Sequence, residues 1–107
     1  MDHDDLLTQI HALIAASAAP ADAAVLARME DTLTVGYARA LALEAERWRL
    51  ERRIGELAAG LATGSSSDAG DLATLARRMS DTDAEVVRLR AALASLRDRA
   101  SELRSAA

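Results

Sequence analysis

The residues best suited to bind a metal ion stand at the amino end of the chain. His3, His11 and the aspartates Asp2, Asp4 and Asp5 carry the nitrogen and oxygen atoms that metals take as ligands. Eight residues separate the two histidines, a spacing that does not bring them to one face of a helix. Acidic residues ahead of a helix are explained by the helix dipole, which stabilises negative charge there. We therefore expect neither a metal site nor a cofactor.

The side chains that serve as catalytic nucleophiles are scarce or poorly placed. The chain has no Cys, which excludes disulfides and thiolate chemistry. The stretch "GSSSDAG", residues 64–70, has the glycines of a phosphate-binding loop, but the chain has no Lys to complete that motif. No Ser stands in a GxSxG-like turn. We expect that the protein is not an enzyme and that the stretch is a flexible linker.

Arginine supplies every basic residue of the chain. All 13 basic residues are Arg, and Lys, Asn and Phe are absent, a bias typical of a high-GC bacterium. The net charge of -4 argues against nonspecific nucleic-acid binding, which needs a basic surface. Two arginine pairs are candidates to hold an anionic ligand between chains, although solvated helix faces explain them as well. These candidates are Arg77, Arg78, Arg88 and Arg90.

The composition favours helix throughout. Ala, Leu, Arg and Glu are strong helix formers, whereas the chain has one Tyr, one Trp and no Phe. Pro20 is suited to open a helix, and the Gly- and Ser-rich stretch after residue 62 ends one. We predict a single domain, 1–107, with a short helix at about 4–17, a long helix at about 21–62, a flexible linker at 63–70 and a long helix at about 71–105.

Both long segments repeat apolar residues at alternating steps of three and four. This heptad pattern is typical of coiled-coil packing, and a short linker favours an antiparallel hairpin. The predicted fold is therefore all-α, an antiparallel coiled-coil helical hairpin with a short N-terminal third helix. We expect both long helices to continue through 31–36 and 80–85. The heptad positions are 26, 29, 33, 36, 40, 43, 47, 50, 54, 57 and 61, and then 72, 75, 79, 82, 86, 89, 93, 96, 100 and 103.

A register for the hairpin can be proposed from these positions. Placing Leu61 opposite Leu75 brings Gly36 opposite Ala100. The flanking charges support this register only weakly, because each exposed ion pair contributes about 0.2–1 kcal/mol. The opposite-sign neighbours are Glu30 with Arg104, Glu44 with Arg90 and Arg53 with Glu85, and the like-sign neighbours are Glu51 with Asp83 and Arg39 with Arg99.

The single tryptophan lies away from the heptad positions. At ~100° per residue, Trp48 shares a face with Leu41 and Tyr37, while Arg47 occupies the neighbouring heptad position. The first helix spans only about 21 Å, so it should lie beside residues 22–36 and leave Trp48 uncovered. Either arginine stems cover the indole, or a second chain buries it. We identify Tyr37, Leu41 and Trp48 as the candidate partner interface.

Two functional hypotheses follow. The first is a non-catalytic interaction protein, a scaffold or regulatory adaptor that forms a homodimer. The second is a ligand-gated regulator, in which facing arginines bind an anionic metabolite or nucleotide and control association with a transcription or signalling protein. The acidic N-terminus is unlike a signal peptide, and no apolar run reaches the length of a membrane span. We therefore expect a cytoplasmic protein that contacts neither membrane nor nucleic acid.

Overall fold

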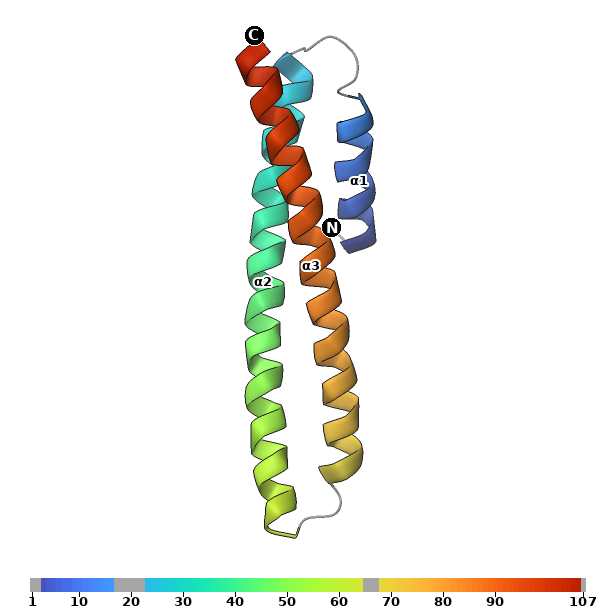
Figure 1. The fold of residues 1–107 in the computed structure, drawn as a ribbon, viewed down its shortest axis with the longest axis vertical. Coiled ribbons are helices and arrows are strands. Elements are labelled where there is room, and N and C mark those ends of the chain that lie inside the picture. The colour runs from blue at the N-terminus through green and yellow to red at the C-terminus, as the bar shows by residue number, and fades with distance from the viewer. Residues whose placement is uncertain (1–2, 17–22, 65–67, 107) are drawn as a thin grey trace. The chain divides into compact units, whose positions relative to one another are not determined.

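The computed structural model describes residues 3–16, 23–64 and 68–106 (Figure 1). They form three helices, α1 (His3–Ala16), α2 (Ala23–Ala62) and α3 (Asp68–Ala106). The long helices α2 and α3 run antiparallel as a hairpin, which confirms the predicted all-α class and the short third helix at the amino end. The proposed role of Pro20 falls on residues 17–22, which lie outside the described residues.

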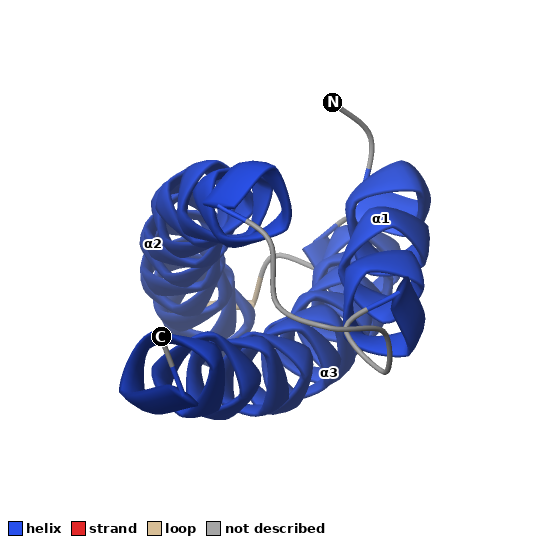
Figure 2. Ribbon diagram, turned by 90° about the horizontal axis from the view of Figure 1, so that it is seen from above, coloured by secondary structure: helices blue, strands red, loops and turns tan. Residues whose placement is uncertain are grey.

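The chain divides into two compact units that share the two long helices. Unit 1 comprises residues 1–40 and 87–107, and unit 2 comprises residues 41–86. Seen along the helix axes, the three helices of unit 1 surround a common interior (Figure 2). That interior contains fully buried side chains from each helix, among them Ile10, Met29 and Leu93. Unit 2 contains only α2 and α3 among its described residues.

The heptad pattern correctly predicts which residues α2 and α3 bury. Every predicted heptad position on both helices is buried or half-buried except Arg47, which is exposed. In unit 2 the buried apolar side chains of α2 are Leu43, Leu50 and Leu57, which recur at intervals of seven. The long helices are continuous through 31–36 and 80–85, as expected. At the first of these places the Thr34 hydroxyl donates to the Glu30 carbonyl at 3.1 Å, one turn back along the helix.

The short helix α1 lies where its length predicts. Leu6 and Ile10 are buried in unit 1, and the Gln9 amide nitrogen donates to the Thr32 hydroxyl of α2 at 3.3 Å. A small surface groove is lined by Leu6 and Gln9 together with residues 31, 32 and 35. Helix α1 therefore lies beside α2 at residues 31–35, within the predicted stretch, and it also lies along α3.

The predicted register is wrong by about one heptad. A Cβ atom added to Gly36 would overlap Leu93 Cδ2, so Gly36 faces Leu93 rather than the predicted Ala100. In unit 2 the register with Leu61 opposite Leu75 would place Leu57 opposite Met79, but a groove brings Leu57 beside Leu75, a shift in the same direction. The heptad pattern permits this difference, because a shift of seven residues again places apolar residues opposite apolar residues. Helix α3 also begins at residue 68 and not at 71.

Candidate interaction surface

The exposed large apolar side chains of unit 2 lie on α2. Leu41 is 62% exposed and Trp48 is 57% exposed, and seven residues place them on one helix face two turns apart. Tyr37, the third residue of the predicted interface, is half-buried and belongs to unit 1. The structure thus brings Leu41 and Trp48 together on one exposed face, and Tyr37 contributes less surface than the sequence suggested.

The exposed face of α2 is longer than Leu41 and Trp48 alone. Starting at residue 41, alternating steps of four and three trace a line of exposed positions nearly opposite the buried Leu43 and Leu50. We call this line the outer face of α2. Its members are Leu41, Ala45, Trp48, Arg52, Gly55, Ala59 and Ala62.

Most of the outer face consists of residues with small side chains. Around Gly55, no atom lies within 4 Å of the position a Cβ would take. The large residues of this face, Leu41 and Trp48, were predicted from the sequence, and the small ones were not. The signal that reveals them is a second heptad alternation, offset from the buried heptad positions by one and two residues in turn.

Arg52 partly covers the indole of Trp48. Its guanidinium carbon lies 4.9 Å from the ring centroid, one helical turn further along α2. Such a cation–π contact contributes about 0.5–1 kcal/mol at an exposed site. This contact agrees in part with the first of the two predicted arrangements, in which arginine side chains cover the indole. More than half of the Trp48 surface nevertheless remains accessible.

The charges beside the outer face are largely engaged within unit 2. Arg47 forms an ion pair with Asp83 of α3 and a second with Glu51 on its own helix at 3.3 Å. Arg78 of α3 lies 3.6 Å from Glu46 of α2. These exposed pairs are worth little stability individually. They hold the guanidinium of Arg47 among exposed carboxylates, although Arg47 occupies a heptad position.

The four candidate anion-binding arginines do not form one described cluster. Arg77 and Arg78 belong to unit 2, where Arg78 already faces Glu46. Arg88 and Arg90 belong to unit 1. Arg88 is exposed, whereas Arg90 is half-buried and engaged in contacts of its own.

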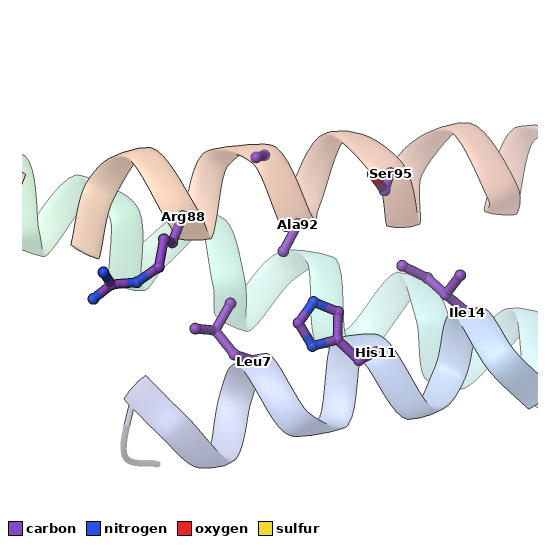
Figure 3. Close-up of a pocket in the computed structure, with 7 residues that line it drawn as sticks. Leu7, His11, Ile14, Arg88, Ala92 and Ser95 are labelled. Atoms are coloured by element: carbon purple, nitrogen blue, oxygen red, sulfur yellow. The ribbon is translucent and has the colours of Figure 1, made fainter. Parts of the chain in front are cut away.

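Arg88 lines a surface groove between α1 and α3 in unit 1. The groove has a volume of about 350 Å³, and its lining is mostly apolar. In Figure 3, His11 lies between Leu7 and Ile14 on α1, facing α3, and the guanidinium of Arg88 lies at one end. An open groove with one cationic end suits a small anionic or amphiphilic molecule better than it suits catalysis.

Neither a group of metal-binding side chains nor a membrane-spanning helix is found among the described residues. Within residues 3–16, 23–64 and 68–106, no three His, Asp or Glu side chains gather closely enough to hold a metal ion. None of the described helices combines the length and apolar character needed to cross a membrane. Asp2, one of the metal-ligand candidates, lies outside the described residues.

The fold and this surface define an all-α helical hairpin with an exposed apolar face on one long helix. Comparison with protein-family models, curated proteins and solved structures finds no match to this chain.

Proposed function

We propose that this chain is a non-catalytic interaction protein, a scaffold or regulatory adaptor that self-associates through the outer face of α2. The observation that carries this proposal is the sparse core of unit 2. Of the fifteen buried apolar residues in the described parts of the chain, only Leu43, Leu50 and Leu57 belong to residues 41–86. The same unit leaves Leu41 and Trp48 exposed. A second chain would bury apolar surface that a two-helix unit cannot bury alone.

Several features of the chain are consistent with this function. Trp is enriched among the residues that dominate binding energy at interfaces, and Leu41 adds apolar surface two turns away. Tyr37 belongs to the same sequence-predicted interface, but its partial burial makes it a minor contributor. We place this protein in the cytoplasm of a high-GC bacterium, acting as a homodimer.

Mass measurement by light scattering tests the proposal. We expect the wild type to exceed the monomer mass at high concentration and Trp48→Ala to remain monomeric at matched concentrations. Val87→Ala is the control, because Val87 is 68% exposed on α3 and belongs to unit 1, whereas the outer face belongs to unit 2. Trp48 is the only tryptophan, so its emission should shift to shorter wavelength as the wild type associates. A wild type that stays monomeric, with constant emission, would refute self-association.

A ligand-gated regulator is the second candidate, and the groove beside Arg88 is the observation that favours it. A nucleotide or other anionic metabolite that binds the folded chain must raise its melting temperature by mass action. Arg88→Ala should abolish that rise, whereas Arg77→Ala, on the same helix but outside the groove, should preserve it. If a panel of nucleotides leaves the melting temperature of the wild type unchanged, this candidate loses its support.

A further inference from the structure

The spacing of the outer face identifies the kind of partner it accepts. Leu41, Trp48, Gly55 and Ala62 recur at intervals of seven, and Ala45, Arg52 and Ala59 fill the alternate steps. This spacing is what a single partner helix requires for knobs-into-holes packing. We propose that the partner is α2 of a second copy of this chain, running antiparallel. The proposal deepens the proposed function and rests on it.

The distribution of large and small residues favours an antiparallel arrangement. The large side chains lie at the amino end of the outer face, at Leu41 and Trp48, and the small ones at its carboxyl end. A parallel pair would stack Trp48 on its own copy and leave Gly55 against Gly55. In the antiparallel pair, Trp48 lies over Ala59 of the second copy, where a small residue leaves room for the indole.

Charge selects the register of this pair. Arg49 and Glu56 lie on the same edge of the outer face, seven residues apart. With Trp48 over Ala59, each Arg49 comes beside Glu56 of the other copy, so the contact occurs twice. Antiparallel coiled coils bring such edge positions together.

The competing register shifts the second copy by one heptad. It would place Arg49 beside Arg49 and Glu51 beside Glu51 of the other chain, with like charges in contact at both edges. Like charges in contact oppose association. The favoured register avoids both repulsions.

The charges within one chain leave Arg49 available for this role. Arg49 is exposed, and neither an ion pair nor a hydrogen bond from its side chain is found among the described residues. It lines a shallow groove with Arg52, Arg53 and Glu56, so three cations there surround one carboxylate. Glu56 itself lies 3.2 Å from Arg53, an exposed pair that is easily exchanged. A second copy would supply each such groove with an additional Glu56.

The small residues of the outer face also explain how two helices approach there. The space above Gly55 is open, with no atom within 4 Å of an added Cβ. In the proposed register Arg52 of the second copy lies over Gly55, and Ala45 lies opposite Ala62. The contact spans residues 45–62 of each copy, or roughly 27 Å of helix, and leaves Leu41 beyond the end of the partner's α2.

Engineered cysteines test the orientation, because the natural chain has no Cys. Ala45→Cys and Ala62→Cys chains are prepared separately, mixed in equal amounts and exposed to oxidised glutathione. The antiparallel pair should give disulfide-linked heterodimers in the mixture and almost none in either chain alone. Efficient cross-linking of Ala45→Cys with itself would indicate a parallel pair and overturn the proposal. Absence of the mixed disulfide in a protein that is dimeric by light scattering would also overturn it.

Charge exchange tests the register. Arg49→Glu and Glu56→Arg should each raise the dimer dissociation constant by about ten-fold or more, since each change turns two attractions into two repulsions. The double variant should return to within about three-fold of the wild type, because the pairs are restored with their signs exchanged. Arg77→Glu on α3 is the control for the change in net charge and should leave the constant unaffected.

The outcomes separate this inference from the function on which it rests. If Trp48→Ala abolishes the dimer but Arg49→Glu and Glu56→Arg leave its dissociation constant unchanged, the proposed function stands and the antiparallel register is refuted. A wild type that is monomeric throughout refutes self-association, and the inference fails with it. Folding of the charge variants is verified by helical circular dichroism. Arg49→Glu places a carboxylate four residues before Arg53, which favours the helix.

Discussion

Gly36 and Gly55 allow one substitution to be compared in two environments on the same helix. Replacing a glycine in the interior of a helix by alanine adds about 1 kcal/mol of stability through helix propensity. At Gly55 nothing opposes this gain, because no atom lies within 4 Å of the added Cβ. We therefore expect Gly55→Ala to stabilise the protein by about 0.5–1 kcal/mol.

At Gly36 the same change meets a filled core. The added Cβ would overlap Leu93 Cδ2 and lie 3.3 Å from Leu93 Cγ. Leu93 and its neighbours Leu89 and Leu96 are fully buried, so the side chain has no open space into which to turn. Overpacking of this kind costs about 1–3 kcal/mol, which cancels or exceeds the helix-propensity gain. We expect Gly36→Ala to change stability by between zero and a loss of about 2 kcal/mol.

The difference between the two variants is the measurable quantity. It should be about 1–3 kcal/mol, with Gly55→Ala the more stable, and each kcal/mol corresponds to roughly 4–8 °C in melting temperature for a domain of this size. Thermal and urea unfolding should be followed by circular dichroism at a concentration where light scattering gives the monomer mass. Equal shifts for the two variants would refute the placement of Gly36 against Leu93.

A second substitution tests whether Leu93 causes the destabilisation expected for Gly36→Ala. Leu93→Ala removes the atoms that the new Cβ would meet. In that background Gly36→Ala should become neutral or stabilising, a coupling of about 1–3 kcal/mol in a double-mutant cycle. If Gly36→Ala is as harmful with Ala at residue 93 as with Leu, its cost arises elsewhere.

Two further substitutions test the ends and the packing of the helices. Ile10→Ala should lower the free energy of unfolding by about 2–5 kcal/mol, because Ile10 is fully buried, whereas the exposed neighbour His11→Ala should change it by less than about 0.5 kcal/mol in urea titrations. Gly64→Ala should lower the free energy of unfolding by about 1–2 kcal/mol, because Gly64 follows α2 with φ of 99°, a conformation unfavourable for alanine. Gly70→Ala is the control and should not lower the free energy of unfolding, because Gly70 has no positive φ. Equal melting temperatures for the two alanine variants would contradict this prediction.

The sequence predicted the helices and their buried faces well because the heptad pattern depends on local spacing alone. Met29, Leu50 and Leu93 are buried because each falls on the repeat. The register could not be obtained in the same way. A shift of seven residues brings apolar positions opposite apolar positions again, so Gly36 could face either Ala100 or Leu93 with little change in pattern.

The start of α3 was likewise not determined by the heptad pattern. The Gly- and Ser-rich stretch allowed a start at residue 71, but the structure extends the helix back to residue 68. The predicted ion pair of Glu30 with Arg104 is observed at 3.4 Å despite the shift, because the Arg side chain is long enough to reach across it. Long side chains are therefore poor reporters of register, and glycine contacts are better ones.

The exposure of Trp48 was predictable, whereas that of its neighbours was only partly so. Helix geometry alone places Trp48 off the buried face. Tyr37 lies on the same side, yet it is half-buried, because burial depends on what packs around each unit and not only on angle. Among the described residues, Val35 and Val87 are also exposed, which was not predicted from the sequence.

The unequal cores of the two units have a consequence for how the chain opens. Each long helix has one part in unit 1, with three helices and a dense interior, and one part in unit 2, where only three of the described apolar residues are buried, all on α2. Amide hydrogens in 41–64 and 68–86 should therefore exchange with solvent through partial unfolding at a lower free energy than those in 23–40 and 87–106. The boundary between the two cooperatively unfolding regions would then lie within each long helix and not at its termini. A partner bound to the outer face would slow exchange mainly in the less protected half, so hydrogen exchange would report its binding locally, along single unbroken helices.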